Sequence, residues 1–227
     1  MNAAAPELRS VATPSEAAGL VVDLAHRPRP GAMLVAVSGV DGSGKTRLAR
    51  ELAGELERAG LRVALIGIDP WQNPQTTRFS TVEPATHFYR HAIRFDQLFS
   101  QLVDPLVADR AIRLETRAIR TDADVWDELV YDHADVQVVL LEGIFLFRRD
   151  LARRYDLRIW VDCSLDTALR RALARNAENR PLELLRRDYE RIYHAAQRVH
   201  FAIDDPRSAA DLRLANDIDV PTPGSMS

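Results

Sequence analysis

Met33-Leu-Val-Ala-Val-Ser-Gly39-Val-Asp-Gly-Ser-Gly44-Lys45-Thr46 is the segment of this chain whose architecture can be read most directly. The short apolar run at its start, bounded by glycines, predicts a buried strand over Met33–Ser38. Gly39–Thr46 then matches the pattern G-x-x-x-x-G-K-[ST] in full. A helix is expected from about Gly44 to Ala59, because Leu48, Leu52 and Leu56 share one stripe. Strand, glycine-rich loop and helix in this order predict a site for phosphate groups.

The chemistry of this phosphate loop follows from its residue types. Its glycines let the backbone curl so that successive N–H groups point at one anion, and the helix N-terminus adds its positive end. Lys45, which is the only lysine in the chain, supplies a mobile charge for the β- and γ-phosphates. The Thr46 hydroxyl is a ligand for Mg²⁺. The residues expected to hold the nucleotide are Gly39, Asp41, Gly42, Ser43, Gly44, Lys45 and Thr46.

Further apolar strands alternate with helices along the chain. Strands are expected at Arg62–Ile68, Gln137–Leu141, Leu157–Val161 and Leu212–Ala215, and helices at Pro14–His26, Phe95–Leu106, Leu165–Arg175 and Leu182 to about Val199. This alternation predicts an α/β fold of the P-loop NTPase class, with three layers, a parallel sheet and helices on both faces. We expect residues 1–31 to be an N-terminal extension with a frayed start and one short helix. Residues 32–217 would form the main domain with a helical lid at about 175–190, and 218–227 a flexible tail.

Composition excludes several classes of function. The net charge is −3 and the pI about 6.1, which gives no electrostatic reason for binding nucleic acid. The apolar stretch around Val136–Phe147 is interrupted by Glu142 and is too short to span a membrane. One cysteine, Cys163, allows neither an intrachain disulfide nor a zinc site built from cysteines. These features favour a cytoplasmic protein that acts on a small molecule, and leave a homo-oligomer open.

Two carboxylates close strands of the predicted sheet. Asp69 ends the second strand and Glu142 the third, so both should project from the same edge as the phosphate loop. A carboxylate in this position can orient Mg²⁺ or take a proton from an acceptor hydroxyl. We assign Asp69 as the general base and substrate-orienting residue, and Glu142 either to the shell of Mg²⁺ or to positioning of the substrate. Thr46 and Asp69 are the other candidate ligands of Mg²⁺. The alternative for Asp69 is an ordinary turn residue, since Asp-Pro commonly starts turns.

Arginines follow on the helical segments. Arg171 and Arg175 are four residues apart and share a helix face. Arginines carried by a closing lid can stabilise the charge that develops on a moving phosphoryl group. The alternative is a solvated basic face. A GTPase of the Asn-Lys-x-Asp type is excluded, because no lysine other than Lys45 exists.

These segments resemble the uridine kinase family of P-loop kinases, a group that includes phosphoribulokinase and bacterial pantothenate kinase. The resemblance rests on Val37–Thr46, Ile66–Trp71, Leu140–Phe147 and Asp156–Arg175, with Ala210–Asp217 near the end. It implies a kinase that uses ATP or GTP with Mg²⁺ and phosphorylates the 5′-hydroxyl of uridine or cytidine. It also implies that Asp69 is the catalytic aspartate and that Arg171 and Arg175 lie near the nucleotide phosphates.

Two departures from the family bear on the acceptor. The usual Asp-Ser-Phe-Tyr stretch is Asp69-Pro-Trp-Gln72 here, and Trp71, Phe88 and Phe95 are candidates either for stacking on a substrate ring or for the core. The base-recognition hairpin has no clear counterpart between Trp71 and Asp135. The candidates for contacting a base are Tyr89, His87, His91, Tyr131 and His133. Other acceptors therefore stay open, namely a sugar phosphate, pantothenate or nicotinamide riboside, as does a P-loop ATPase or switch module.

Overall fold

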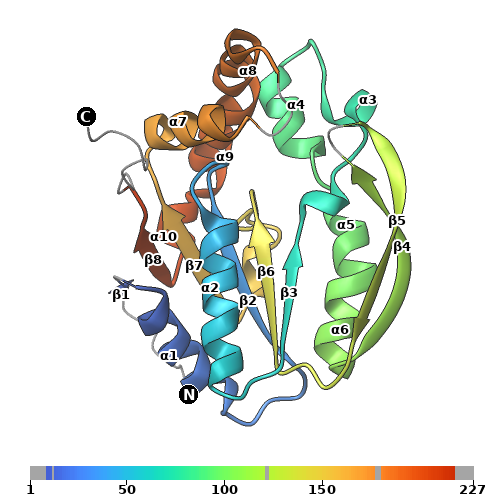
Figure 1. Ribbon diagram of the computed structural model, residues 1–227, viewed down its shortest axis with the longest axis vertical. Helices are drawn as coiled ribbons and strands as arrows, with labels where there is room; N and C mark the ends of the chain where they lie inside the picture. The colour runs from blue at the N-terminus through green and yellow to red at the C-terminus, as the bar shows by residue number, and fades with distance from the viewer. Residues whose placement is uncertain (1–8, 12, 121–122, 177–179, 218–227) are drawn as a thin grey trace, which may run out of the picture.

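Strand β2 (Met33–Gly39) lies inside the main sheet of the computed structural model, which describes residues 9–11, 13–120, 123–176 and 180–217. Within those residues, six strands pair in parallel (Figure 1). In spatial order they are β1 (Arg9–Val11), β8 (Leu212–Ala215), β7 (Leu157–Asp162), β2, β6 (Val138–Gly143) and β3 (Val63–Gly67). The predicted parallel α/β sheet is confirmed.

Helices cover both faces of this sheet, because its central strands are apolar on both sides. In β2, Met33, Val35 and Val37 pack into one core with helices α1 (Pro14–Ala25) and α2 (Lys45–Arg58). Leu34 and Ala36 point to the other core. That second core is built with α4 (Pro84–His91), with the run α5 (Phe95–Leu98), η2 (Phe99–Val103) and α6 (Asp104–Asp109), and with α9 (His194–Asp204).

The remaining helical elements stand mostly at the carboxyl end of the sheet. They are η1 (Asp69–Trp71), α3 (Gln75–Arg78), α7 (Leu165–Arg175), α8 (Leu182–Asp188) and η4 (Tyr189–Tyr193), together with η3 (Ala152–Arg154) and α10 (Pro206–Ala209). Elements α8, η4 and α9 follow one another without a break, and α7 and α8 lie above the phosphate loop (Figure 1). In the described chain, no helix has the length and apolar character that crossing a membrane requires.

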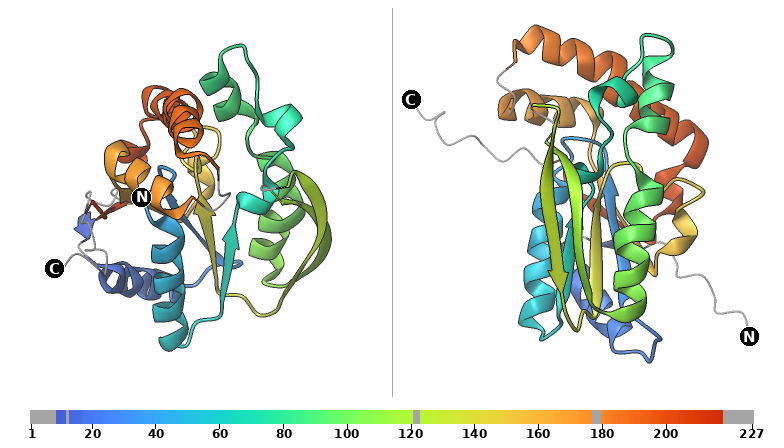
Figure 2. Two further views of the ribbon diagram at one scale, coloured as in Figure 1. Left: turned by 45° about the horizontal axis from the view of Figure 1, so that its top comes forward. Right: turned by 90° about the vertical axis from the view of Figure 1, so that its right-hand side faces the viewer.

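A long antiparallel hairpin lies in the middle of the chain, where the sequence showed no clear counterpart of a base-recognition hairpin. Strands β4 (Ile112–Arg120) and β5 (Val125–His133) pair over nine residues each and flank α5 and α6 (Figure 2). Trp71 ties η1 to this hairpin, since its Nε1 donates to the Tyr131 hydroxyl at 3.0 Å. Half-buried and exposed residues alternate along β4, as in a strand that is covered on one side.

The N-terminal segment also differs from expectation. Residues 1–13 were expected to be frayed, but Arg9–Val11 forms β1 and pairs with Leu212–Leu214 of β8. Thr13 caps α1 in a reciprocal capping box with Glu16, which stabilises the start of that helix. The predicted flexible tail at 218–227 and the lid residues 177–179 lie outside the described residues.

Candidate active site

The carboxyl ends of β2, β6 and β3 meet at one level, as the register of the sheet requires. Glu142 of β6 stands opposite Val37 of β2 on one side and Gly67 of β3 on the other. Asp69 follows β3 directly and begins η1. A cleft of about 1680 Å³ opens above this edge. It lies between the phosphate loop, the tip of the hairpin and the elements α7, α8 and η4, which we call the lid elements. The phosphate loop and both predicted carboxylates therefore share one edge of the sheet.

The phosphate loop has the backbone that its glycines predict. Gly42 and Gly44 have φ angles of 81° and 88°, a region that favours glycine, and α2 begins at Lys45. The amide of Asn216 holds the loop from outside, because its Nδ2 donates to the Ser43 carbonyl oxygen at 2.6 Å. A Cβ atom at Gly44 would come within 2.5 Å of that Nδ2, so a larger residue would break this support. No motif in the sequence points to Asn216.

Lys45 and Thr46 line the floor of the cleft, and Glu142 lies beside Thr46. The Thr46 hydroxyl donates to Glu142 Oε1 at 3.2 Å, and Lys45 is only 8% exposed. Burial raises the pKa of Glu142 above its ordinary value, and the negative charge of Asp69 adds to this, while Lys45 and the Thr46 hydrogen bond oppose it. A cation bound beside a buried carboxyl group would stabilise its ionised form and offset the cost of burying that charge.

The oxygen atoms at this position suit Mg²⁺. Mg²⁺ prefers oxygen ligands and is commonly held by one or two carboxylates together with substrate phosphates. Thr46, Glu142 and Asp69 offer such a set at the foot of the phosphate loop. Among the described residues no three His, Cys, Asp or Glu side chains gather as a metal site of their own. The donor set therefore fits an ion that arrives with a nucleotide.

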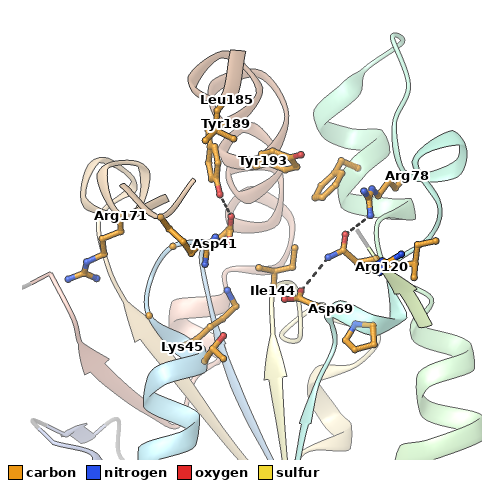
Figure 3. Close-up of a pocket in the computed structure, with 18 of the residues that line it drawn as sticks. Asp41, Lys45, Asp69, Arg78, Arg120, Ile144, Arg171, Leu185, Tyr189 and Tyr193 are labelled. Atoms are coloured by element: carbon orange, nitrogen blue, oxygen red, sulfur yellow. Dashed lines mark hydrogen bonds and ion pairs between the residues drawn. The ribbon is translucent and has the colours of Figure 1, made fainter. Parts of the chain in front are cut away.

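Asp69 is exposed at the mouth of the cleft and belongs to a chain of three polar side chains. Gln72 Nε2 donates to Asp69 Oδ1 at 3.3 Å, and Gln72 Oε1 accepts from Arg78 Nη1 at 2.9 Å (Figure 3). Arg78 is buried in the wall of the cleft. Neither Gln72 nor Arg78 was singled out in the sequence, because no motif marks them. Gln72 thus links Asp69, the expected base, to Arg78.

The lid elements reach the phosphate loop through Asp41. The Tyr189 hydroxyl donates a hydrogen bond to Asp41 Oδ2, and Arg175 Nη2 lies 3.9 Å from Asp41 Oδ1. Burial opposes ionisation of this carboxyl, but Lys45, Tyr189 and Arg175 together hold the pKa of Asp41 below its ordinary value. Asp41 is thus a charged contact between loop and lid.

Arg171 lines the cleft, and its guanidinium contacts carbonyl oxygens beside the phosphate loop. Its Nη1 donates to the Asn216 carbonyl oxygen at 2.8 Å and lies 3.5 Å from that of Ser43. In Figure 3 its guanidinium points away from Lys45 and Asp41. The reason is that Asn216, brought in after β8, offers a carbonyl oxygen behind the loop. Arg171 supports the loop from that side, and contact with nucleotide phosphates stays a prediction for Arg171 and Arg175.

None of the tyrosine and histidine candidates for contacting a base lines the cleft that the described residues form. Tyr131 and His133 lie on the hairpin, and Tyr89 is buried with its hydroxyl 2.5 Å from Asp204 Oδ2. The His87 ring nitrogen Nε2 is 2.8 Å from the Thr77 carbonyl oxygen, and its ring lies beside that of His91. Of the three aromatic candidates, Trp71 and Phe95 belong to the core, while Phe88 also lines the cleft.

Comparison with known proteins places these features in a family context. The model of the phosphoribulokinase/uridine kinase family matches residues 34–201. A thymidylate kinase of Xanthomonas campestris is 34% identical over 155 residues, which cover 64% of this chain and 63% of that protein. A uridine-cytidine kinase of Dictyostelium discoideum is 28% identical over 75% of this chain and 69% of its own length. The chain thus spans less than two thirds of the thymidylate kinases it matches.

Solved structures share the fold. A candidate uridine kinase of Bacillus stearothermophilus superposes with a TM-score of 0.68 at 19% identity, covering 88% of this chain and 97% of its own. A candidate fructose transport system kinase of Silicibacter gives a TM-score of 0.70 at 22% identity, covering 89% and 99%. At these identities the likeness concerns the fold alone.

Proposed function

Because this chain belongs to the phosphoribulokinase/uridine kinase family, we propose that it is a kinase that transfers the γ-phosphoryl group of ATP to a hydroxyl group of a small molecule. The observation that carries the proposal is the shared edge described above. A phosphate loop with its lysine and an accessible carboxylate, Asp69, line one cleft. A phosphate donor and a hydroxyl acceptor bound there would face each other across that edge.

Each residue has a role in this proposal. The loop amides and Lys45 hold the β- and γ-phosphates and stabilise the charge on the transferred group. Thr46 and Glu142, with Asp69 nearby, would hold Mg²⁺, which supplies charge neutralisation on the phosphates when bound. Asp69 accepts the proton of the acceptor hydroxyl as that oxygen attacks phosphorus. Arg175 approaches the phosphates with the lid.

A pyrimidine nucleoside is the acceptor that the family resemblance implies. Relatives named as uridine kinases and uridine-cytidine kinases support it. Relatives named as thymidylate kinases argue for including a nucleoside monophosphate among the test compounds. Sugar phosphates, pantothenate and nicotinamide riboside complete the panel. ATP is the proposed donor, with GTP as the alternative to be assayed beside it.

The test is ADP release by the purified chain with Mg²⁺-ATP across this acceptor panel. We expect release that depends on both Mg²⁺ and one acceptor. Lys45→Met, which keeps the aliphatic stem, should reduce turnover at least about 100-fold. Arg58→Met is the matched control, since Arg58 lies at the far end of α2 and is 67% exposed. Steady ADP release that no acceptor accelerates would instead support a P-loop ATPase or switch.

A further inference from the structure

Arg78 is a buried charge in the wall of the cleft. It ends the short helix α3, lines the cleft and is only 5% exposed. In Figure 3, Arg78 and Lys45 come from opposite walls, with Asp69 between them. Arg78 therefore stands on the side of the expected base that faces away from the phosphate loop, where an acceptor would bind under the proposed function.

The contacts of Arg78 leave its charge uncompensated. Its Nη1 donates to Gln72 Oε1 at 2.9 Å and lies 3.4 Å from the Asn73 carbonyl oxygen. Its Nε is buried and has no hydrogen-bond partner. Among the described residues, no carboxylate lies within ion-pair distance of it. The guanidinium carbon of Arg78 also lies over the ring of Phe79, 5.1 Å from the ring centre.

Other arginines around the same cleft differ in this respect. Each of three arginines has a carboxylate oxygen close to its guanidinium. The distances are 3.5 Å from Arg120 Nε to Asp127 Oδ2, 3.9 Å from Arg175 Nη2 to Asp41 Oδ1, and 2.5 Å from Arg180 Nη2 to Asp188 Oδ2. Arg120 and Arg175 are also more than half exposed, so water screens their charge. Among the described residues no carboxylate pairs with Arg78, and at 5% exposure its guanidinium has little access to solvent that would offset the cost of burial. An anion supplied by a ligand would satisfy it.

We propose that the acceptor of this kinase carries an oxyanion, either a phosphate or a carboxylate, in addition to the hydroxyl that is phosphorylated, and that Arg78 binds that oxyanion. The inference rests on the proposed function and narrows its acceptor. Planar guanidinium groups suit carboxylate and phosphate oxygens because their N–H groups form a fork. Gln72 contacts both Arg78 and Asp69, so it sets the spacing between the bound oxyanion and the base.

The first test measures binding without turnover. The full chain is saturated with Mg²⁺ and a non-hydrolysable ATP analogue, which occupies the phosphate loop. Ribose 5-phosphate and glycerate, with ribose and glycerol as their neutral counterparts, are then titrated while the unfolding temperature is followed. We expect at least one anion, and neither neutral counterpart, to stabilise the wild type. Arg78→Met should lower the affinity of the chain for that anion by at least about 30-fold, because the bound anion loses the buried positive charge that pairs with it.

Arg90→Met is the matched control, since Arg90 is exposed on α4 and does not line the cleft. Arg78→Lys keeps the positive charge but lacks the planar set of guanidinium N–H donors. It replaces Arg78→Met in the binding test if the methionine variant fails to fold. It should retain part of the anion affinity. Anion binding that is equal in the wild type and the Arg78 variants would overturn the inference, as would a wild type that no anionic probe stabilises.

The second test uses turnover of the same compounds and of uridine. Preference for an anionic acceptor, lost in Arg78→Met with the affinity for the ATP analogue retained, supports the inference. Preference for uridine over every anion overturns it and leaves the proposed kinase function intact. If no acceptor accelerates ADP release, the proposed function fails, and the binding test still decides whether Arg78 holds an oxyanion.

Discussion

The hydroxyl of Tyr189 on η4 donates a hydrogen bond to Asp41 in the phosphate loop, 148 residues away in the sequence. This contact joins the lid to the site expected to hold the triphosphate. Arg175 at the end of α7 approaches the same carboxylate, so two lid elements converge on one loop residue. We expect this shared contact to couple the positions of α7 and η4 to occupation of the loop.

Tyr189→Phe removes that contact and keeps the ring. We expect a loss of about 1 kcal/mol in the free energy of unfolding and about fivefold faster dissociation of ATP, since a hydrogen bond contributes roughly that much. Stopped-flow release of a fluorescent ATP analogue measures the rate. Tyr155→Phe is the control, because the Tyr155 hydroxyl is buried without a partner and its removal should leave the rate unchanged. Equal dissociation rates in the wild type and Tyr189→Phe would refute the coupling.

Asp69→Asn tests the proposed base. We expect kcat to fall about 100- to 10,000-fold while the affinity for ATP stays within about twofold, because proton acceptance is needed only in the chemical step. Steady-state rates and a nucleotide titration give the two quantities. Asp96→Asn, at an exposed position on α5, should change neither. An unchanged kcat in Asp69→Asn would exclude this carboxylate as the base.

Glu142→Gln should stabilise the nucleotide-free protein while abolishing most activity. The folded-state pKa of Glu142 is raised by burial, so the native state binds its proton more tightly than the unfolded state does. Stability contributed by the protonated form is present at low pH and is lost as pH rises from the ordinary glutamate pKa through the raised one. The unfolding temperature of the variant should therefore exceed that of the wild type by an increasing amount as the pH rises above the ordinary glutamate pKa of about 4.3.

The same variant should lose about 100-fold or more in Mg²⁺-dependent turnover, since the carboxylate no longer contributes charge to the metal. Thermal melts at several pH values and Mg²⁺ titrations separate the two effects. A stability difference that does not vary with pH would contradict the assigned pKa direction.

Asn216→Ala removes the amide that supports the phosphate loop at Ser43. The expected result is about tenfold weaker ATP binding, measured by calorimetry, because the loop is less well preorganised. Asn73→Ala provides the comparison, since Asn73 also donates to a backbone carbonyl oxygen, that of His91, at 2.8 Å but does not touch the loop. Both variants should lose similar stability, and only the first should lose affinity. Equal ATP affinities in the two variants would show that the support is not needed.

The parts of the fold that the sequence predicts are those with a strong local signal. The phosphate loop, the strand before it and the helix after it carry their own motif, and α7 and β8 begin and end where expected. The three residues of β1 carry no such signal, since only pairing with β8 makes them a strand. The hairpin was harder to find because charged residues occupy much of its exposed side.

The site divides in the same way. Lys45, Thr46, Asp69 and Glu142 follow from a motif and from strand ends, and the structure brings them to one edge. Asn216 depends on a contact between distant segments, which no spacing in the sequence encodes. Gln72 and Arg78 are near Asp69 in the sequence, but their contacts depend on an irregular turn that no motif marks. Arg171 shows the limit of pattern reasoning, because its helix position was foreseen but its hydrogen-bond partner was not.

Parallel pairing between β1 and β8 has a consequence for the order in which the molecule assembles. Arg9 stands opposite Leu212, so the outermost pair of the sheet joins segments that a ribosome makes about two hundred residues apart. Closing so large a loop is entropically costly and belongs to the slow events of folding. Until β7 and β8 have been made and paired, β1 has no partner strand in the sheet. The first strand of the described sheet to be synthesised must therefore wait for the last one before it can pair.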